Sequence, residues 1–385
     1  MKLEQLKTVC VVGAGDMGHG IAQLALMDGY DVNLYDISRE IVDKGINRIR
    51  ESLGKLIEKG AVQASLLERA EQGGKLKGFV NLPDAVGGAE FVIEAVPEKL
   101  AVKEAALRDI SKYAKPGAII ASNTSTMGIT MLSRFVGAPG NFIGTHYFNP
   151  AVLMKLVEVV KGELTSDETV EFTCGYVKKL GKELIYARKD SPGFIANRIT
   201  VPGVIYNFDC IETDKIEPAD IDATMMRHGL KMGPIELIDY TGIDVLCGAL
   251  EYYHEHLSDD YAIPESVKEK QALGQLGKKT GQGFYKWPER GRPAIDAGSY
   301  SGRYDPDIPF FIQANESCKL LESGICSLED CDRAMVYGFN TQGPIGYIQR
   351  FEPEAIAAAL DRVADRFGKR IFRPADTILK GRYRG

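Results

Sequence analysis

The sequence predicts an α/β domain followed by two all-α domains, and three observations lead to this fold class. Short apolar runs rich in β-forming residues alternate with helical patterns as far as residue 190, which is typical of a mostly parallel sheet covered by helices. From about residue 193 onward, nearly every segment has the spacing of an amphipathic helix. Residues of the first helical stretch then recur in a second stretch at a nearly constant offset.

The composition is that of a globular protein with more than one domain. A chain of 385 residues is longer than one hydrophobic core usually supports, and 44% hydrophobic with 26% charged residues is ordinary for such a protein. A formal net charge of −6 argues against general binding to nucleic acid or to an anionic membrane. No apolar run is long enough to span a bilayer, and residues 9–12 are too short a run for a signal peptide. We therefore expect a cytoplasmic protein with no nucleic-acid or membrane partner.

The cysteine and histidine patterns predict no metal site. The seven cysteines are scattered, odd in number and form no Cys-x-x-Cys pair, which favours reduced thiols over disulfides or a zinc site. His254 and His256 are two positions apart, so on a helix of 3.6 residues per turn their side chains diverge by about 200°.

A glycine-rich turn follows the first predicted strand, at residues 8–12. Gly13-Ala14-Gly15-Asp16-Met17-Gly18 leads into a helical pattern at 20–27, and a second strand at 32–35 ends in Asp36. Glycines in this context permit a tight turn, close approach to a pyrophosphate and close packing of helix on strand. Asp36 can accept both ribose hydroxyls of NAD and would repel the 2′-phosphate of NADP. The pattern predicts a Rossmann-type dinucleotide site, and a purely structural glycine turn is the alternative.

Residues 40–72 read as helices whose apolar positions are three and four apart. A separate face carries Arg48, Ser52, Lys55 and Lys59. Such rows are usually solvated, and the residues alone favour that interpretation. The alternative is a docking face for a second phosphate-bearing ligand.

Polar residues stand at the carboxyl ends of later strands, where open α/β sheets bind ligands. A buried strand at 89–96 precedes a helix opened by Pro97-Glu98, and a strand at 118–122 ends in the polar segment 123–126. Within that segment, Ser125 can donate a hydrogen bond to a substrate oxygen, or cap a helix that starts near Met127.

The strongest candidates for proton transfer are His146 and Glu158. His146 ends a strand predicted over 142–145, and the next strand, 154–160, carries Glu158 on an apolar face. A carboxylate there needs a partner, and a histidine at the end of the neighbouring strand supplies one. An imidazole held through one nitrogen can exchange a proton with substrate through the other. The alternative is a satisfied core histidine beside an unrelated glutamate.

The α/β domain is predicted to end near residue 190, after a helix at 167–180 and a strand at 183–186. A long helix from about 193 carries Asn197 near its start. Further helices are predicted at 218–228, 234–256 and 264–274, followed by a basic glycine-rich loop at 277–285 and a linker at 288–305.

An internal repeat follows the linker. Asp220, Asp222, Met225 and 233–235 recur, 110 residues later, as Asp330, Asp332, Met335 and 343–345. The predicted domains are therefore 1–190 (dinucleotide-binding), 191–287 (helical) and 306–385 (a second helical copy). The second copy has no histidine–glutamate pair of this kind, so we assign no chemistry to it.

Taken together, these motifs resemble the L-3-hydroxyacyl-CoA dehydrogenase family along nearly the whole chain. The stretches that carry the resemblance are the glycine motif 13–18, Ser122-Asn-Thr-Ser125, His146-Tyr-Phe-Asn-Pro150, Met154-Lys-Leu-Val-Glu158, Pro192-Gly-Phe-Ile-Ala-Asn-Arg198, Met232-Gly-Pro234 and Gly277-Lys-Lys-Thr-Gly281. The resemblance implies reversible, NAD-dependent oxidation of (S)-3-hydroxyacyl-CoA to 3-oxoacyl-CoA, as in β-oxidation, with direct hydride transfer and no metal.

The resemblance also implies roles for individual residues. His146 would be the general base, Glu158 would orient it, and Ser125 and Asn197 would bind the substrate oxygen. The implied cofactor residues are Gly13, Gly15, Asp16, Met17, Gly18, Asp36, Glu98, Lys103, Asn123, Ser125, Asn149 and Lys279. Ser52 and Lys59 match positions that meet coenzyme A, as does Ser125 for the substrate, which reverses the interpretation of the basic helix face as merely solvated.

The carboxyl-terminal copy resembles the tandem domain of the multifunctional fatty-acid oxidation protein. Single-copy relatives dimerise through the helical domain, so the second copy is expected to cover that surface within one chain, at 191–287 against 306–385. This pseudo-dimer is compatible with a monomer, and further association stays open. Two other functions are the alternatives: a related dehydrogenase of a free hydroxy acid or sugar acid, as in the crystallin-like relatives, and a nucleotide-binding structural or regulatory protein without catalysis.

Overall fold

The computed structural model describes residues 2–71, 74–296, 298 and 300–384. The chain divides into two compact units between Phe194 and Ile195, four residues beyond the predicted boundary at 190. The finer division of the second unit at 287 and 306 stays a prediction. Among the described residues, no helix combines the length and the apolar character that crossing a membrane requires.

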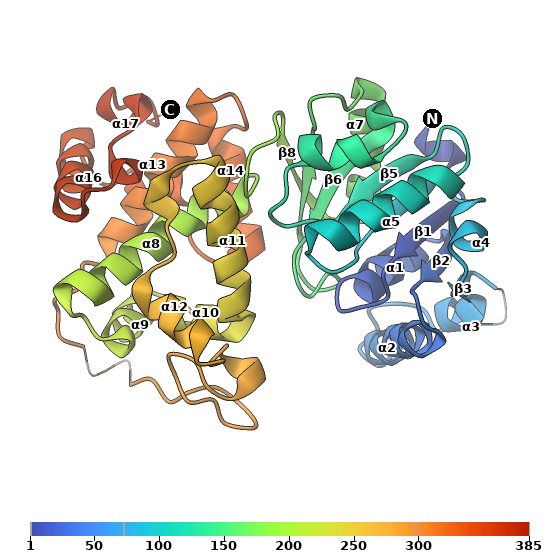
Figure 1. Cartoon of the computed structure of the whole chain (residues 1–385), viewed down its shortest axis with the longest axis horizontal. Helices are drawn as coiled ribbons and strands as arrows, with labels where there is room; N and C mark the ends of the chain where they lie inside the picture. Colours follow the sequence, from blue (N-terminus) through green and yellow to red (C-terminus); the bar gives the residue numbers. More distant parts are fainter. Residues whose placement is uncertain (1, 72–73, 297, 299, 385) are drawn as a thin grey trace. The chain divides into compact units, whose positions relative to one another are not determined.

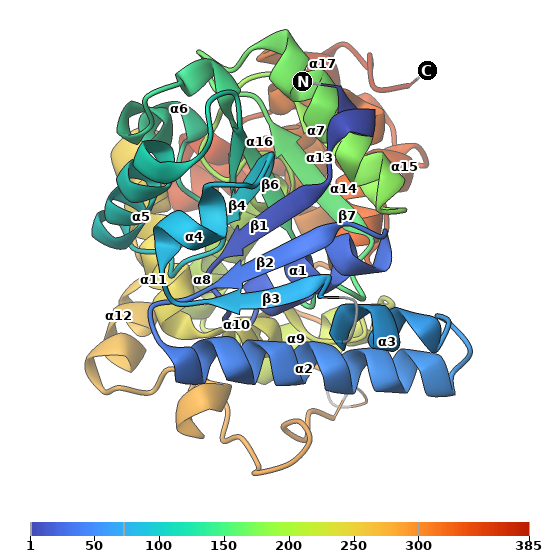
Figure 2. The same ribbon diagram turned by 90° about the vertical axis from the view of Figure 1, so that its right-hand side faces the viewer.

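The first unit is built on one sheet of eight strands, in the order β3-β2-β1-β4-β5-β6-β7-β8. The strands are β1 (Thr8–Val12), β2 (Asp31–Tyr35), β3 (Leu76–Phe79), β4 (Phe91–Glu94), β5 (Ile119–Ser122), β6 (Phe142–Tyr147), β7 (Leu156–Val160) and β8 (Glu183–Ala187). All neighbouring pairs are parallel except β6 and β7. The first six strands have the order of a doubly wound dinucleotide-binding sheet, which confirms the predicted fold class. Figure 2 shows β4, β1, β2 and β3 side by side.

Helices cover this sheet. They are α1 (Gly18–Met27), α2 (Arg39–Glu58), α3 (Ser65–Glu71), α4 (Leu82–Val86), α5 (Leu100–Tyr113), α6 (Ile129–Leu132) and α7 (Asp167–Lys179), with 3-10 turns at Leu3–Gln5, Ser133–Phe135 and Pro139–Asn141. One hydrophobic core joins side chains of α1, α2, α3 and α7 to the strands, including the edge-to-face ring pair of Phe91 and Tyr176. Helix α5 is drawn in front of the strands in Figure 1.

Local sequence signals account for where these helices begin. The Ser38 side chain accepts a hydrogen bond from the Ile41 amide at the start of α2. Ser166 does the same for Thr169 at the start of α7, a helix with two acidic residues in its first turn and two lysines in its last. These caps satisfy amide groups that the first turn leaves without a helical partner, and the charges complement the helix dipole.

The named elements of the second unit are all helices where the chain is described, apart from two isolated β-bridges within 277–286. The helices are α8 (Ala196–Asp214), α9 (Pro218–Arg227), α10 (Pro234–Thr241), α11 (Ile243–His256), α12 (Glu265–Ala272), α13 (Asp307–Glu322), α14 (Leu328–Phe339), α15 (Pro344–Ile348), α16 (Pro353–Phe367) and α17 (Asp376–Leu379), with 3-10 turns at Asp259–Tyr261, Lys278–Thr280 and Arg370–Phe372. The single helix predicted over 234–256 is wrong. It breaks at Gly242, whose φ of +113° lies outside the helical region and separates α10 from α11.

The two helical copies share one hydrophobic core. Helix α8 of the first copy packs against α13 of the second, and the core contains Ile205 and Tyr206 together with Phe311 and Ile312 (Figure 1). A partly buried ion pair joins Arg198 to Glu316, with Nε and Oε1 2.5 Å apart. These contacts are what the predicted pairing of the two copies requires.

The same local device occurs in both copies. The Asp222 carboxylate accepts hydrogen bonds from the Ile235 and Glu236 amides, and 110 residues later Asp332 accepts them from Ile345 and Gly346. In each copy a glycine lies so close to the aspartate that a Cβ would meet its side chain. The repeat read from the sequence is therefore a repeat of structure.

The segment predicted as a linker is held by the first copy where it is described. Nε and Nη2 of Arg292 donate to the two carboxylate oxygens of Glu236. The Ser301 amide donates to Asp220, and the Tyr304 hydroxyl donates to Asn207. Glycine and proline make its composition linker-like, but these side chains fix its path.

Candidate active site

The glycine-rich turn lies between β1 and α1, and glycine suits each of its three glycine positions for a different reason. At Gly13, where φ is +108°, a Cβ would come within 2.5 Å of the Ala95 carbonyl oxygen. At Gly18 a Cβ would lie 1.7 Å from the Gly13 carbonyl oxygen, so only glycine lets α1 start here. No atom lies within 4 Å of the position a Gly15 Cβ would take. Gly15 therefore offers open space beside the backbone, as close approach of a pyrophosphate requires.

Asp36 lies just beyond β2 and faces this turn. One carboxylate oxygen accepts a hydrogen bond from the Ala14 amide at 2.8 Å, and the other accepts one from the Ile37 amide at 2.7 Å. The carboxylate is thereby fixed at the carboxyl edge of the sheet, where an adenosine ribose is bound in this fold. The exposed Asp16 side chain within the turn pairs with Arg48 of α2, with 2.6 Å between Oδ1 and the guanidinium. The glycine turn and Asp36 thus fit an NAD molecule.

His146 and Glu158 face each other across the antiparallel strands β6 and β7. They are directly paired in the strand register, and His146 Nδ1 lies 2.5 Å from Glu158 Oε2. Glu158 is fully buried and the His146 side chain is 8% exposed. The rings of Phe148 and Phe194 lie 4.5 and 6.0 Å from the imidazole, measured between centroids. The sequence-predicted contact between these two residues is present.

The polar segment after β5 is organised by Glu98. Its Oε1 accepts hydrogen bonds from the Thr124 hydroxyl at 2.5 Å, the Ser125 amide at 3.0 Å and the Thr126 amide at 3.3 Å. The hydroxyl of Thr124, rather than that of Ser125, accepts the Met127 amide, and α6 begins only at residue 129. Two expected site residues, Glu98 and Ser125, are therefore joined directly through the Ser125 amide.

Lys103 is buried between two carboxylates. Its Nζ lies 2.8 Å from Glu94 Oε1 and 3.0 Å from Glu98 Oε2. Burial alone would lower the pKa of the Lys103 ammonium, but the two carboxylates raise that pKa above its ordinary value. Sequence reasoning missed Glu94. The available signal was a carboxylate closing an otherwise apolar strand.

The two asparagines expected at the cofactor follow strands β5 and β6. The Asn123 side-chain oxygen accepts a hydrogen bond from the Tyr147 amide at 3.0 Å, which ties the ends of these strands together. Asn149 is exposed and precedes Pro150. Both therefore lie at the carboxyl edge of the sheet: Asn149 follows His146 by three residues, and Asn123 is bonded to the residue after His146.

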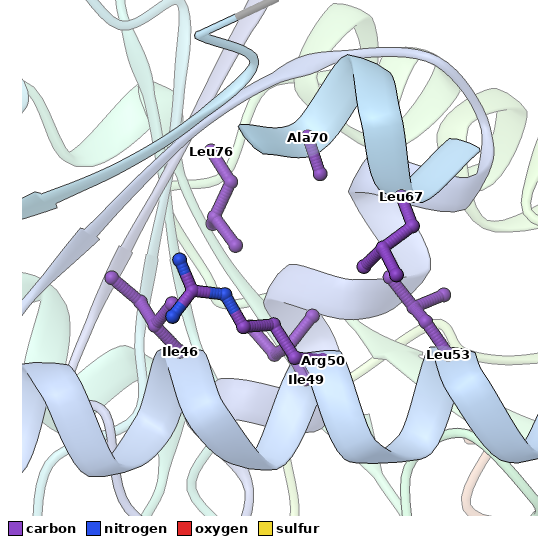
Figure 3. Close-up of a pocket in the computed structure, with 7 residues that line it drawn as sticks. All are labelled: Ile46, Ile49, Arg50, Leu53, Leu67, Ala70 and Leu76. Atoms are coloured by element: carbon purple, nitrogen blue, oxygen red, sulfur yellow. The ribbon is translucent and has the colours of Figure 1, made fainter. Parts of the chain in front are cut away.

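The basic face of α2 and a nearby cavity are separate features. Ser52 and Lys59 are seven positions apart and so share one side of the helix, Lys59 being exposed and Ser52 half-buried. A cavity of about 170 Å³ lies between α2, α3 and β3 (Figure 3). It is lined by Ile46, Ile49, Arg50, Leu53, Leu67, Ala70 and Leu76. No residue of the basic face lines it.

Two expected site residues belong to the second unit. Asn197 lies in the first turn of α8, and Lys279 lies in the 3-10 turn after Gly277, paired with Asp244. Their contribution to a site with His146 stays a prediction. Within the described residues, no cluster of three histidine, cysteine or acidic side chains is arranged to hold a metal ion.

Comparison with known proteins gives concordant matches. Residues 8–191 match the model of the 3-hydroxyacyl-CoA dehydrogenase NAD-binding domain, and residues 193–287 match that of the 3-hydroxyacyl-CoA dehydrogenase C-terminal domain. A probable 3-hydroxybutyryl-CoA dehydrogenase of Deinococcus radiodurans is 39% identical over 284 residues, covering 72% of this chain and 99% of that protein.

Two further matches extend over the second helical copy. The fatty acid oxidation complex subunit alpha of Pseudomonas aeruginosa is 32% identical over 94% of this chain, which spans 53% of that protein's length. The crystal structure of 3-hydroxybutyryl-CoA dehydrogenase from Escherichia coli K12 superposes with a TM-score of 0.86 at 27% identity, covering 98% of both chains. The tandem helical arrangement therefore has a full-length structural counterpart.

Proposed function

The chain belongs to the 3-hydroxyacyl-CoA dehydrogenase family, and from this premise we propose the reaction and the side chains that carry it. It is an NAD-dependent oxidoreductase of that family. The proposed reaction is the reversible oxidation of an (S)-3-hydroxyacyl-CoA to a 3-oxoacyl-CoA. The observation that carries this proposal is the His146–Glu158 pair, held in the same unit as the glycine turn and Asp36.

In the proposed mechanism His146 handles the proton. Its Nδ1 contacts Glu158, so its Nε2 is the nitrogen that can take the proton from the C3 hydroxyl. Glu158 holds the imidazole in one orientation and stabilises the imidazolium that forms. The C3–H bond breaks with its electron pair while the C3–O bond becomes a carbonyl. Bound NAD supplies the acceptor for that hydride.

The remaining site residues position the reactants in this proposal. Ser125 and Asn197 donate hydrogen bonds to the substrate oxygen. Gly13, Gly15, Asp16, Met17, Gly18 and Asp36 hold the adenosine and pyrophosphate, whereas Glu98, Lys103, Asn123, Asn149 and Lys279 lie toward the nicotinamide. Support comes from topology, because in this strand order the two halves of a dinucleotide lie over opposite halves of the sheet.

The substrate in this proposal is the coenzyme A thioester rather than the free acid. Ser52 and Lys59, on one side of α2, meet the coenzyme A moiety, and the local cations Arg48, Lys55 and Lys59 favour an anionic ligand in a protein of net charge −6. We further propose a cytoplasmic enzyme that is monomeric because its second helical copy covers the surface used for dimerisation in single-copy relatives.

The test is NADH oxidation by the purified chain, followed at the nicotinamide absorbance. Acetoacetyl-CoA is the test substrate and free acetoacetate is the control. We expect turnover with the thioester only, and competition by free coenzyme A. Turnover of the free acid without inhibition by coenzyme A would contradict the proposal and favour a hydroxy-acid or sugar-acid dehydrogenase.

A further inference from the structure

The carboxylate of Glu94 is wholly enclosed at the carboxyl edge of the sheet, and the proposed mechanism does not use it. It ends β4, the strand between β1, which leads into the glycine turn, and β5, which leads into the Ser125 segment. Glu94 is 0% exposed. A buried carboxylate is costly unless its oxygens are fully hydrogen-bonded, so its partners show what it does for the structure.

Three donors converge on this carboxylate. Oε1 accepts the Val96 amide at 2.8 Å and the Lys103 ammonium at 2.8 Å, and Oε2 accepts the Ser122 hydroxyl at 2.6 Å. Val96 follows Glu94 by two residues, and Ser122 ends the neighbouring strand β5. Both donors are close to the backbone, so they fix the Glu94 carboxylate in place. Lys103, by contrast, is a long side chain from α5 whose ammonium would otherwise be free to choose its position.

Lys103 connects the fixed carboxylate of Glu94 to the carboxylate of Glu98. The ammonium touches Glu94 on one side and Glu98 on the other, and it also donates to the Val96 carbonyl at 3.3 Å. Burial alone would raise the pKa of the Glu98 carboxyl, but the charge of Lys103 lowers that pKa below its ordinary value, so Glu98 stays ionised. The second oxygen of Glu98 then accepts the amides of Ser125 and Thr126.

We propose that Glu94 is a positioning residue, which acts through Lys103 and Glu98 to fix the nicotinamide end of the cofactor site and the Ser125 segment. Two carboxylates share one ammonium, so the ammonium stays midway between them. When the charge of Glu94 is removed, Lys103 is drawn to Glu98 alone, and Glu98 is displaced from the Ser125 and Thr126 amides. The part of this inference that concerns Ser125 rests on the proposed reaction, whereas the part that concerns the cofactor rests on NAD binding and on the proposed place of Glu98 at the nicotinamide.

The variant Glu94→Gln removes the negative charge of this side chain and keeps its size and shape. A glutamine has the same shape, its oxygen can still accept from Val96 and Lys103, and its amide can donate to the Ser122 hydroxyl. We therefore expect a folded protein, with a thermal midpoint within a few degrees of wild type. Glu104→Gln is the matched control, because Glu104 lies one position beyond Lys103 on α5 but is half-exposed and pairs with Arg108.

The decisive experiment is a double-mutant cycle on NADH affinity, measured by nicotinamide fluorescence. We expect Glu94→Gln and Glu98→Gln each to raise the NADH dissociation constant about fivefold or more, and the double variant to resemble Glu98→Gln alone rather than the product of the two. Ser122→Ala, which removes one of the bonds that fix Glu94, should give a smaller change in the same direction. Glu104→Gln should match wild type.

Two results would overturn the inference. One is NADH affinity within twofold of wild type in Glu94→Gln, with or without a lower thermal midpoint, since that marks a purely structural carboxylate. The other is a double variant whose loss equals the product of the single losses, since independent effects exclude action through Glu98. The cycle measures NADH binding, so it tests this inference even if the wild-type protein does not turn over acetoacetyl-CoA. Such a lack of turnover would contradict the proposed reaction and leave the binding result unaffected.

Discussion

At the scale of single residues, the site consists of buried ionisable side chains held by specific partners. Glu158 has no exposed surface, and the imidazole of His146 is its hydrogen-bond partner across β6 and β7. Lys103 is likewise almost wholly buried and lies between two carboxylates. In such surroundings, removing one partner costs more free energy than a single hydrogen bond contributes. The remaining buried group then has neither its partner nor water to bond with.

Glu158→Gln tests whether the carboxylate supports the charged imidazole. Glutamine keeps the shape and can keep one hydrogen bond to Nδ1, but it lacks the negative charge that stabilises an imidazolium. We expect the turnover number with acetoacetyl-CoA to fall by a factor on the order of 10 to 100, with NADH affinity unchanged. Steady-state kinetics and a fluorescence titration measure the two quantities, and full activity in this variant would remove Glu158 from its proposed role.

At the scale of elements, the function depends on where strands end and how one helix is charged. The carboxyl ends of β1, β2, β4, β5 and β6 bring the glycine turn, Asp36, Glu94, the Ser125 segment and His146 to one edge of the sheet. Helix α2 adds the face with Ser52 and Lys59. Under the proposed function, cofactor choice and thioester binding depend on two different elements, so substitutions should change them separately.

Asp36→Asn tests cofactor selection at the end of β2. The carboxylate would repel the 2′-phosphate of NADPH, and a neutral side chain removes that repulsion while keeping an oxygen for the Ala14 amide. We expect the preference for NADH over NADPH, expressed as the ratio of kcat/KM values, to fall by roughly tenfold or more, which corresponds to about 1.4 kcal/mol. An unchanged ratio would mean that Asp36 does not select the cofactor.

Lys59→Met tests the basic side of α2. We expect the KM for acetoacetyl-CoA to rise about two- to fivefold, as an exposed cation at a phosphate would give, with little change in kcat. A truncated thioester that lacks the nucleotide should show no difference between variant and wild type. Lys44→Met, on an exposed part of the same helix, is the control, and an equal effect of both substitutions would argue against a specific coenzyme A contact.

Sequence patterns predicted most of these elements because their signals are local. The glycine turn, the strand ends with Asp36 and His146, and the repeat of Asp222 and Asp332 can all be read from spacing. Strand β3 was not predicted, since Leu76–Phe79 contains a glycine and lies half-exposed at the sheet edge. The link from Glu94 through Lys103 to Glu98 depends on how α5 packs against β4, which spacing does not determine.

At the scale of the whole molecule, the second helical copy forms one core with the first. Helix α13 packs on α8, Arg198 pairs with Glu316, and aromatic residues of both copies pack together. If this packing replaces dimerisation, the chain should sediment as a single species near its own mass of 42.2 kDa at micromolar concentrations. A species of twice that mass would contradict the proposed monomer.

The stability of the whole chain should carry a pH signature from Asp222. The pKa of this carboxyl is raised to about 7, because burial raises it by more than the hydrogen bonds from the Tyr285 hydroxyl and two backbone amides lower it. Because its folded-state pKa lies above the unfolded value, its contribution to stability is fully present below pH 4 and is lost as the pH rises through about 7. Asp222→Asn should therefore show a shallower fall of thermal midpoint between pH 5 and 8 than wild type, and parallel curves would contradict this assignment.

The most direct test of the central claim is the activity of His146→Gln beside wild type. NADH oxidation with acetoacetyl-CoA and NADH binding are measured on the same preparations, with His256→Gln, an exposed histidine on α11, as the control. We predict that His146→Gln loses activity by a factor on the order of 10² to 10⁴ while its NADH dissociation constant stays within about twofold of wild type. Substantial turnover by His146→Gln would contradict the assignment of His146 as the group that transfers the proton.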